Sequence, residues 1–341
     1  MSTEQNKKPT IYLHVGYPKT GTTTFHEYLT PKVVGIKCFT PSANQQFIES
    51  SNNPNDLNLN YQLRVFFETF WIDDGEVEKT LSMLENSGSD RILISTTGPL
   101  SALFFKGHYT KRGSYITPEK IAAKIKEVFD SRFNVKIIVV IRRQDTWLES
   151  AYAEWFEYFS RQKKYSNLEK FVSHALSPDH QFSKSIDYFE VISAFEKEFG
   201  VENLLIQVYE EMVEDAPMFF LKMLKFVNAT LASGTNLNDI PKKNQRDYNG
   251  KVKKANKLNL YEFLYFLKLR LIPNVSFHLI RKVPKLIQFL SLISLPNREI
   301  NQNIKMLDNQ KDRVRNMFAT PNAKLSEKYG LRLHRFGYCN Q

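Results

Sequence analysis

Short runs of β-branched and aliphatic residues alternate along this chain with longer segments in which apolar residues recur every three or four positions. The uninterrupted apolar runs predict buried strands at about residues 10–16, 91–96, 135–141 and 203–209. The amphipathic segments predict helices at about residues 21–30, 76–87, 118–131, 145–160, 186–199 and 216–228. Strands that alternate with helices and are apolar on both faces favour a parallel sheet covered by helices. The predicted fold class is therefore α/β, and ligands of such sheets bind beyond the carboxyl ends of the strands.

The pattern changes in the last third of the chain. From about residue 231 onward the sequence becomes helical in pattern and basic. We therefore expect residues 1–230 to form the α/β core and residues 231–341 to form a helical basic cap that completes the same domain. With 341 residues and 42% hydrophobic content, the chain is long enough to bury such a core.

Most of the positive charge of the chain lies in one segment of that cap. Residues 241–290 carry 12 lysines and arginines and two acids, which accounts for +10 of the formal net charge of +11. Three interpretations compete: a solvated helical face, an anion-binding wall of a ligand cleft, and a surface that contacts anionic lipid. No nucleic-acid recognition motif accompanies the charge, and no uncharged stretch approaches the roughly 18 residues of a membrane-spanning helix.

Cysteine usage and the first residues bear on the compartment. The two cysteines, Cys38 and Cys339, cannot form a disulfide framework and suit a reducing compartment. Residues 1–9 are polar and carry lysines, without the apolar segment of a secretory signal. We expect a cytoplasmic protein, and the basic segment adds the alternative of a peripheral position at the inner face of the membrane.

A glycine-bounded loop links the first predicted strand to the first predicted helix. It reads Gly-Tyr-Pro-Lys-Thr-Gly-Thr-Thr-Thr from Gly16 to Thr24, and the backbone N–H groups of such loops bind phosphate-like anions. The glycine spacing matches a P-loop, but the usual Gly-Lys-[Ser/Thr] ending is absent and Lys19 lies inside the loop. A connector without a ligand is the alternative; the loop lysine and the hydroxyls argue against it. The candidate anion-binding residues are Pro18, Lys19, Thr20, Gly21, Thr22, Thr23 and Thr24.

A second candidate anion site follows the third predicted strand, which ends in Arg142 and Arg143. Asp145 or Thr146 is expected to cap the next helix at its N-terminus. Arg142 at the strand end and Ser150 on that helix can then converge on one anion, the guanidinium with paired hydrogen bonds and the hydroxyl with a third. Arg143 is expected to be an exposed, solvated charge.

Taken together, the two motifs resemble those of sulfotransferases that use 3′-phosphoadenosine 5′-phosphosulfate (PAPS). The loop resembles their 5′-phosphosulfate loop, and Arg142 followed eight residues later by Ser150 is similar to their 3′-phosphate motif. A less specific likeness extends over most of the chain, including the strand from Asn203 that ends in Tyr-Glu. The resemblance implies PAPS as donor, adenosine 3′,5′-bisphosphate as product, no metal, and a catalytic role for Lys19 at the leaving group.

The identity of the base that would take a proton from the acceptor is undecided at this point. Relatives carry a base at the end of the strand that here spans about residues 91–96, but this strand ends in threonines, which cannot act as bases near neutral pH. Glu49, the only acid in the segment after the first helix, and His108, in a polar loop, are the two candidates. His14 and His26 are expected to be buried structural histidines.

The expected function is sulfuryl transfer to a hydroxyl or amine of a glycan or glycolipid, with a small soluble molecule such as a phenol or steroid as the other acceptor class. Two other functions stay open. A P-loop kinase would place lysine directly after Gly21 and an acid at the strand end for Mg²⁺, where this chain has Thr22 and Arg142. A non-catalytic protein that binds anions or membranes would account for the basic segment but not for two phosphate motifs.

Overall fold

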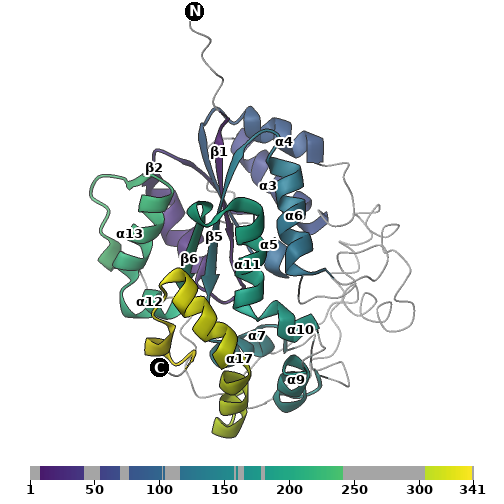
Figure 1. Cartoon of the computed structure of the whole chain (residues 1–341). Helices are drawn as coiled ribbons and strands as arrows, with labels where there is room; N and C mark the ends of the chain where they lie inside the picture. Colours follow the sequence, from purple (N-terminus) through teal and green to yellow (C-terminus); the bar gives the residue numbers. More distant parts are fainter. Residues whose placement is uncertain are drawn as a thin grey trace, which may run out of the picture.

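Five parallel strands form the centre of the structure, a computed structural model (Figure 1). It describes residues 8–41, 54–69, 77–101, 103, 116–156, 159, 165–177, 181–240 and 304–339. The strand order is β3-β4-β1-β5-β6. The strands span Lys37–Phe39 (β3), Arg91–Thr96 (β4), Thr10–Val15 (β1), Asn134–Ile141 (β5) and Leu204–Val208 (β6). This sheet with its flanking helices confirms the predicted α/β class.

The central strands are apolar on both faces, which explains why they pair inside the molecule. In β5 the sequence Val-Lys-Ile-Ile-Val-Val-Ile provides β-branched side chains to both sides. On β1, Ile11 pairs with Ile92 of β4 on one side and with Val135 of β5 on the other. All four strands predicted from the apolar runs are present, with ends within one residue of the prediction.

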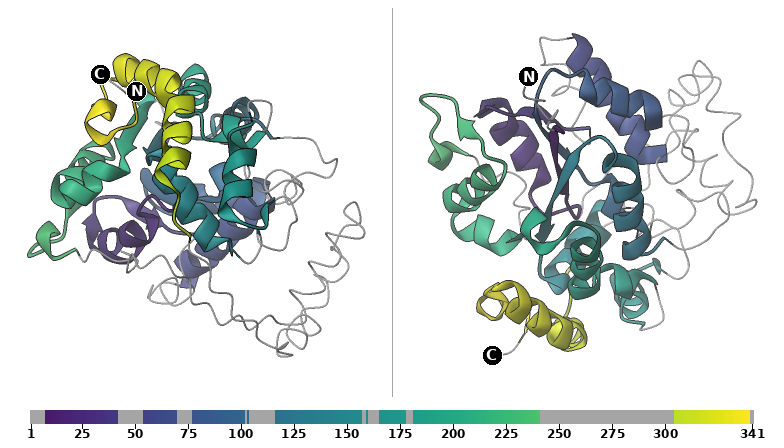
Figure 2. Two further views of the ribbon diagram at one scale, coloured as in Figure 1. Left: turned by 90° about the horizontal axis from the view of Figure 1, so that it is seen from below. Right: turned by 45° about the horizontal axis from the view of Figure 1, so that its top comes forward.

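Helices cover both faces of the sheet, as the views in Figure 2 show. On one face, Ile11 and Leu13 pack in a large core against α3 (Pro54–Thr69), α4 (Val77–Glu85), α6 (Pro118–Phe129) and α11 (Tyr188–Phe199). On the other face, Tyr12, Leu93 and Ile138 pack against the segment after β1 and against α13 (Ala216–Phe226). This arrangement buries the sheet and leaves its carboxyl edge to the connecting loops.

Capping residues fix where several of these helices begin. Thr117 accepts a hydrogen bond from the backbone of Lys120 at the start of α6. Asp187 and Asp215 do the same for α11 and α13, and α11 ends at Gly200, whose φ of 80° favours glycine. The sequence therefore sets these boundaries locally.

Other elements complete the described structure. The predicted first helix is a short α-helix, α1 (Thr22–Thr24), that continues as a π-helix, η1 (Phe25–Leu29), and a 3₁₀ turn, η2 (Thr30–Lys32). The sequence patterns did not predict β3, α3 or the antiparallel pair β2–β7. The remaining elements are β2 (Val33–Val34), α5 (Gly98–Ser101), α7 (Gln144–Glu154), α9 (Leu168–Ala175), α10 (Gln181–Ser185), η4 (Val201–Asn203), α12 (Tyr209–Glu214), β7 (Thr230–Leu231), η5 (Leu237–Asp239), α17 (Asp308–Tyr329) and η6 (Leu333–Phe336).

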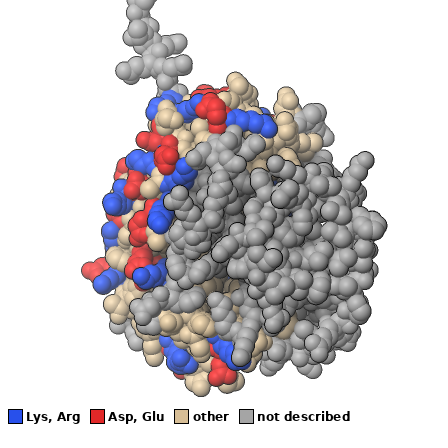
Figure 3. All heavy atoms as spheres, turned by 90° about the vertical axis from the view of Figure 1, so that its right-hand side faces the viewer, with Lys and Arg blue, Asp and Glu red and all other residues tan. Residues whose placement is uncertain are grey.

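The helix α17 returns to the core of the α/β sheet. Val314, Phe318 and Leu325 of this helix are buried in the same core as β1 and α11. The basic segment, residues 241–290, lies outside the described residues. On the described part of the face in Figure 3, Lys and Arg are interspersed with Asp and Glu rather than gathered by sign.

Two further findings concern the compartment. Cys38 and Cys339 are both free thiols and half-buried, and burial raises the pKa of the Cys38 thiol to about 12. Among the helices that the structure describes, none has the length and apolar character needed to span a membrane.

Candidate functional site

The two candidate anion motifs lie at the same edge of the sheet. β1 and β5 are parallel neighbours, so the loop that follows β1 and the arginines that follow β5 leave adjacent strand ends. The loop is joined to the sheet by the backbone N–H of Gly16, which donates to the carbonyl of Thr96 at the end of β4 (3.2 Å). The sequence order of strand, loop and strand thus places both motifs side by side.

Arg142 contacts the loop directly. Its Nη1 donates to the carbonyl oxygen of Lys19 at 2.9 Å, and its Nε donates to Oγ1 of Thr146 at 3.2 Å. The guanidinium carbon lies 4.7 Å from the centre of the Tyr209 ring, in cation–π geometry. Its Nη2 donates to none of the described residues. Arg142 is therefore fixed at one end and retains a donor for a ligand.

One face of α7 connects the two motifs. Thr146, Ser150 and Glu154 are spaced four residues apart and so lie along one side of this helix. Thr146 accepts from Arg142, and the Glu154 carboxylate lies 3.2 Å from Nζ of Lys19. Ser150 is half-buried one turn from both, and its hydroxyl bonds to no residue in the described ranges. The structure thus brings together Lys19, Arg142 and Ser150.

The loop has an unusual backbone that several contacts hold in place. Lys19 has a φ of 69° and Gly21 a φ of 86°, both in the left-handed region. The indole Nε1 of Trp147 donates to the carbonyl of Pro18 at 2.8 Å, and Oγ1 of Thr20 donates to the carbonyl of Tyr17 at 2.5 Å. Together with Arg142, these bonds stabilise the left-handed Lys19, a conformation that costs a non-glycine residue roughly 1–3 kcal/mol.

The loop at Gly21 packs against the end of the Met212 side chain. A Cβ atom at position 21 would lie 2.8 Å from Sδ of Met212, and this flexible side chain could move aside, so the φ of 86° is what favours glycine here. Met212 belongs to α12, the element that also carries Tyr209. α12 therefore packs against both anion motifs.

Below the site lies a set of buried aromatic residues that the sequence analysis did not single out. The Tyr17 ring packs edge-on against Trp147 and Tyr188. Its hydroxyl donates to the carbonyl of Ser185 at 2.8 Å, and the Tyr188 hydroxyl donates to the carbonyl of Arg142 at 2.6 Å. Burial raises the pKa of both tyrosine hydroxyls, which keeps them protonated as donors. Tyr17 lies inside the loop and Trp147 lies within the second motif, whereas Tyr188, at the start of α11, is far from both motifs in sequence.

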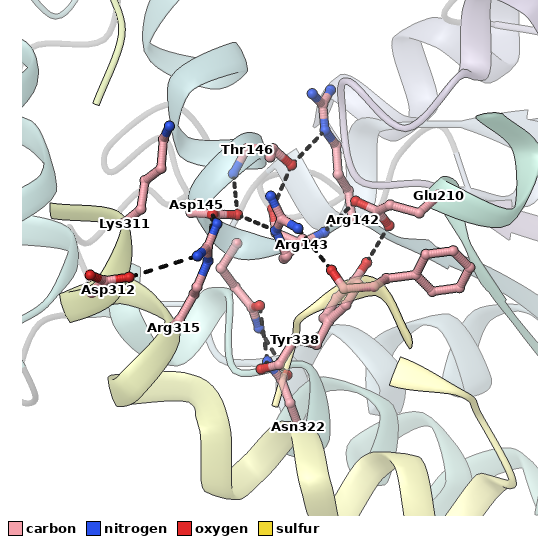
Figure 4. Close-up of polar contacts among 12 residues, drawn as sticks. Arg142, Arg143, Asp145, Thr146, Glu210, Lys311, Asp312, Arg315, Asn322 and Tyr338 are labelled. Atoms are coloured by element: carbon pink, nitrogen blue, oxygen red, sulfur yellow. Dashed lines mark hydrogen bonds and ion pairs between the residues drawn. The ribbon is translucent and has the colours of Figure 1, made fainter. Parts of the chain in front are cut away.

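Arg143 is not the solvated charge that the sequence analysis expected. Its side chain is 24% exposed, and its Nε donates to Oδ1 of Asp145 at 2.7 Å. Its Nη1 donates to the carbonyl of Phe336 at 2.8 Å, and its backbone N–H donates to Glu210 at 3.1 Å (Figure 4). The expectation was wrong because the carboxylate of Asp145 is fully buried and needs a cationic partner.

The expected capping role of Asp145 and Thr146 is also wrong. α7 begins at Gln144, with Arg143 as its N-cap residue and no side-chain cap. Asp145 lies inside the first turn and accepts from the N–H of Thr146 at 2.7 Å. Its other oxygen, Oδ2, pairs with Nε and Nη2 of Arg315, both at 2.9 Å (Figure 4). Asp145 thus ties the start of α7 to α17.

A second set of hydrogen bonds links the chain after α17 to the same place. The side chains of Gln144 and Asn322 exchange two bonds of 3.0 and 3.1 Å, and Asn322 also donates to the carbonyl of Tyr338 at 3.0 Å. The Tyr338 hydroxyl donates to Glu210 at 2.7 Å (Figure 4). The segment from α17 to Tyr338 therefore braces the start of α7 and the end of β6.

The two candidate acceptor bases, Glu49 and His108, lie outside the described residues. His14 and His26 are buried as expected, and both bond to the hydroxyl of Ser95. The described residues contain no group of three or more His, Cys, Asp or Glu side chains that could hold a metal ion.

Comparison with known proteins gives solved structures only. No protein-family model matches the chain, and no curated protein matches its sequence. A sulfotransferase from Alicyclobacillus acidocaldarius is 12% identical, with a TM-score of 0.46 over 95% of this chain and 96% of that one. It is one of several sulfotransferases among the solved structures that this chain resembles.

Two more of these neighbours overlap with a smaller part of the chain. Mouse sulfotransferase SULT7A1, solved in complex with PAP, is 16% identical, with a TM-score of 0.38 over 68% of this chain and 62% of that one. The sulfotransferase domain from the curacin biosynthetic pathway is 15% identical, with a TM-score of 0.37 over 67% and 76%. These overlaps are too weak to assign an activity, which has to rest on the geometry of the site.

Proposed function

We propose that this chain is a sulfotransferase that uses PAPS as its donor. The observation that carries the proposal is the convergence of Lys19, Arg142 and Ser150, from three separate elements, at the carboxyl edge of β1 and β5. One anion motif alone would fit many phosphate ligands. Two of them, joined by a hydrogen bond between Arg142 and the loop, fit a ligand with anionic groups at two positions.

The residues present fit the two anionic ends of PAPS, which supplies the sulfuryl group. Arg142, through Nη2, and the Ser150 hydroxyl would hold the 3′-phosphate. The loop amides with Thr22 and Thr23 would hold the 5′-phosphosulfate. The Tyr209 ring, stacked on Arg142, offers an aromatic surface for the purine between them.

Lys19 would act on the leaving group. Sulfuryl transfer resembles phosphoryl transfer: an in-line displacement in which positioning and charge stabilisation dominate. The ammonium of Lys19 would neutralise the negative charge that develops on the bridging oxygen. That ammonium is paired with Glu154 at 3.2 Å, so a donor bound at the loop would compete with this carboxylate for Lys19.

We propose a hydroxyl or amine of a glycan or glycolipid as the acceptor, with Glu49 or His108 as the base, in a cytoplasmic enzyme. The basic segment at 241–290 supports a position near anionic lipid, where each basic residue adds about 1 kcal/mol. Co-sedimentation with anionic and neutral vesicles at low and high salt tests this part. Failure to bind anionic vesicles at low salt would point to a soluble acceptor and leave the donor assignment intact.

The donor assignment is tested by calorimetry with adenosine 3′,5′-bisphosphate and with ATP–Mg²⁺. We expect clear preference for the bisphosphate, because Arg142 and Ser150 would hold its 3′-phosphate. ATP–Mg²⁺ bound at least as tightly would overturn the proposal and favour a P-loop kinase. Binding of the bisphosphate without any release of sulfate from PAPS would favour a non-catalytic anion-binding protein.

A further inference from the structure

A buried chain of three polar side chains lies under the loop and has no part in the function proposed above. The hydroxyl of Ser95 on β4 lies 2.8 Å from Nδ1 of His14 on β1 and 2.7 Å from Nε2 of His26 on η1. His14 and Ser95 are paired neighbours in the sheet. Their side chains are 2%, 0% and 5% exposed for His14, Ser95 and His26, respectively.

The number of hydrogen atoms that these three side chains can donate is limited. Burial, with the nearby His26, lowers the pKa of His14 to about 3, and burial lowers the pKa of His26 to about 4, so both rings are neutral near pH 7. The Ser95 hydroxyl has one hydrogen, and so it donates to one ring and accepts from the other. The two hydrogen bonds of Ser95 therefore run in the same direction: either both donate towards His14 or both donate towards His26.

The far nitrogen of His14, Nε2, is buried and has no hydrogen-bond partner in the described part of the chain. Leaving such an atom unpaired costs about 1–3 kcal/mol, and native structures seldom retain one without a reason. The atom faces the loop: a Cβ added to Gly16 would lie 3.1 Å from Nε2 and 2.9 Å from Cγ2 of Thr22.

The glycine at position 16 is explained by this space and not by the backbone. Gly16 is not among the residues with positive φ, so its conformation is open to other residues. A side chain there would fill the gap between His14 Nε2 and the first turn after the loop. Gly16 thus keeps a buried nitrogen open towards the loop that we assign to the 5′ end of the donor.

We propose that His14 Nε2–H, beneath the loop, donates a hydrogen bond, directly or through one ordered water, to an oxygen of the donor's 5′-phosphate. We call this hydrogen bond the floor contact. This inference rests on the proposed function. It fixes the direction of these hydrogen bonds: His26 Nε2–H donates to Ser95, Ser95 donates to His14 Nδ1, and His14 Nε2–H faces the loop. Aligned bonds of this kind polarise one another in a buried setting.

Two matched substitutions separate the floor contact from the packing of the ring. In His14→Gln the amide nitrogen reaches the position of Nε2 but loses the bond to Ser95, whereas in His14→Asn it reaches only the position of Nδ1. We expect His14→Asn to weaken adenosine 3′,5′-bisphosphate binding about 10- to 100-fold, the value of one hydrogen bond to a charged group. His14→Gln should stay within about five-fold of the native protein, since it retains the donor.

A second ligand makes the test specific to the 5′ end. Adenosine 3′-monophosphate lacks the 5′-phosphate, so its affinity should be equal in the native protein and in His14→Asn. Equal losses for both nucleotides, or equal losses in the Gln and Asn variants, would overturn the proposal. Thermal unfolding of each variant shows whether it is folded.

Nitrogen-15 NMR of the histidine rings reports on His14 itself, and His14→Gln assigns its signals. We expect the Nε2–H tautomer of His14 and a shift of that signal on adding the bisphosphate; the Nδ1–H tautomer would refute the floor contact. Failure of the native protein to bind the bisphosphate would overturn the proposed function instead. The titration would then use inorganic phosphate, and an unchanged His14 signal would overturn this inference too.

Discussion

Two adjacent arginines that follow β5 are expected to have different roles, so that removing Arg142 weakens ligand binding and removing Arg143 lowers stability. Among the described residues, Nη2 of Arg142 has no hydrogen-bond partner, and the contacts of this side chain are two bonds to neutral oxygens and the Tyr209 ring. Arg142→Ala should therefore remove charge-assisted bonds to the ligand. We expect a loss of about 2–4 kcal/mol in adenosine 3′,5′-bisphosphate binding, or roughly 30- to 1,000-fold.

Arg143 instead compensates a buried charge. Breaking a buried ion pair by removing one partner costs about 3–5 kcal/mol, but Asp145 would keep Arg315, and Arg143 is 24% exposed. We therefore expect Arg143→Ala to lower the free energy of unfolding by about 2–3 kcal/mol, which corresponds to a fall of about 3–4 °C in Tm for a chain of this length. Affinity for the bisphosphate should change by less than about five-fold, because the remaining contacts of Arg142 persist.

Calorimetry with the bisphosphate and thermal unfolding give the two quantities for each variant. Arg315→Ala is the matched control, because it removes the other cation of Asp145 from the far side of the network. It should resemble Arg143→Ala in Tm and the native protein in affinity. If Arg143→Ala lost as much affinity as Arg142→Ala while its Tm stayed unchanged, Arg143 would be an anion ligand and our division of roles would be refuted.

Three further outcomes are expected. Glu154→Gln should strengthen bisphosphate binding about two- to five-fold in calorimetry, because the donor then no longer competes with an ion pair worth up to about 1 kcal/mol; a gain that persists in a Lys19→Met background would show that release of Lys19 is not its cause. Lys19→Ala should reduce the release of sulfate from PAPS far more than bisphosphate affinity, since its role grows in the transition state; equal losses would contradict this. The free energy of unfolding, measured in urea, should fall as pH drops from about 6.5 towards 4, because His14 and His26 have lowered pKa values in the folded protein and the unfolded chain therefore binds more protons in this range. The slope is up to about 1.4 kcal/mol per pH unit for each ring. A slope that His26→Phe leaves unchanged would argue against this explanation.

The parts of the fold that the sequence predicted are those that depend on neighbours along the chain. Apolar runs located β1, β4, β5 and β6 because these strands are buried on both faces. The edge strand β3 has only three residues, Lys37–Phe39, and no such run. The change from α- to π-helix after Thr24 also has no local signal.

The site divides in the same way. The loop and the strand that ends in Arg142 could be located from sequence because each motif is a contiguous strand–loop–helix unit. The role of Arg143 could not be predicted, although its partner Asp145 is only two positions away, because the contacts that surround this pair come from Arg315, 170 positions from Asp145, and from Phe336, 193 positions from Arg143. Nor could the pairing of Lys19 with Glu154, 135 positions away, since only the packing of α7 against the loop brings these side chains together.

The pairing of Asp145 with Arg315 has a consequence for the order of events during protein synthesis. The two residues are 170 positions apart, a length of chain that a ribosome needs about 10–35 s to make at roughly 5–20 residues per second. Throughout that interval the nascent chain contains the loop, Arg142 and Arg143, but the second cation for Asp145 does not yet exist. We expect the carboxylate of Asp145 to stay hydrated until α17 emerges and docks. The first 230 residues contain both anion motifs, yet the ion pairs of Asp145 at the start of α7 are completed by one of the last helices to leave the ribosome.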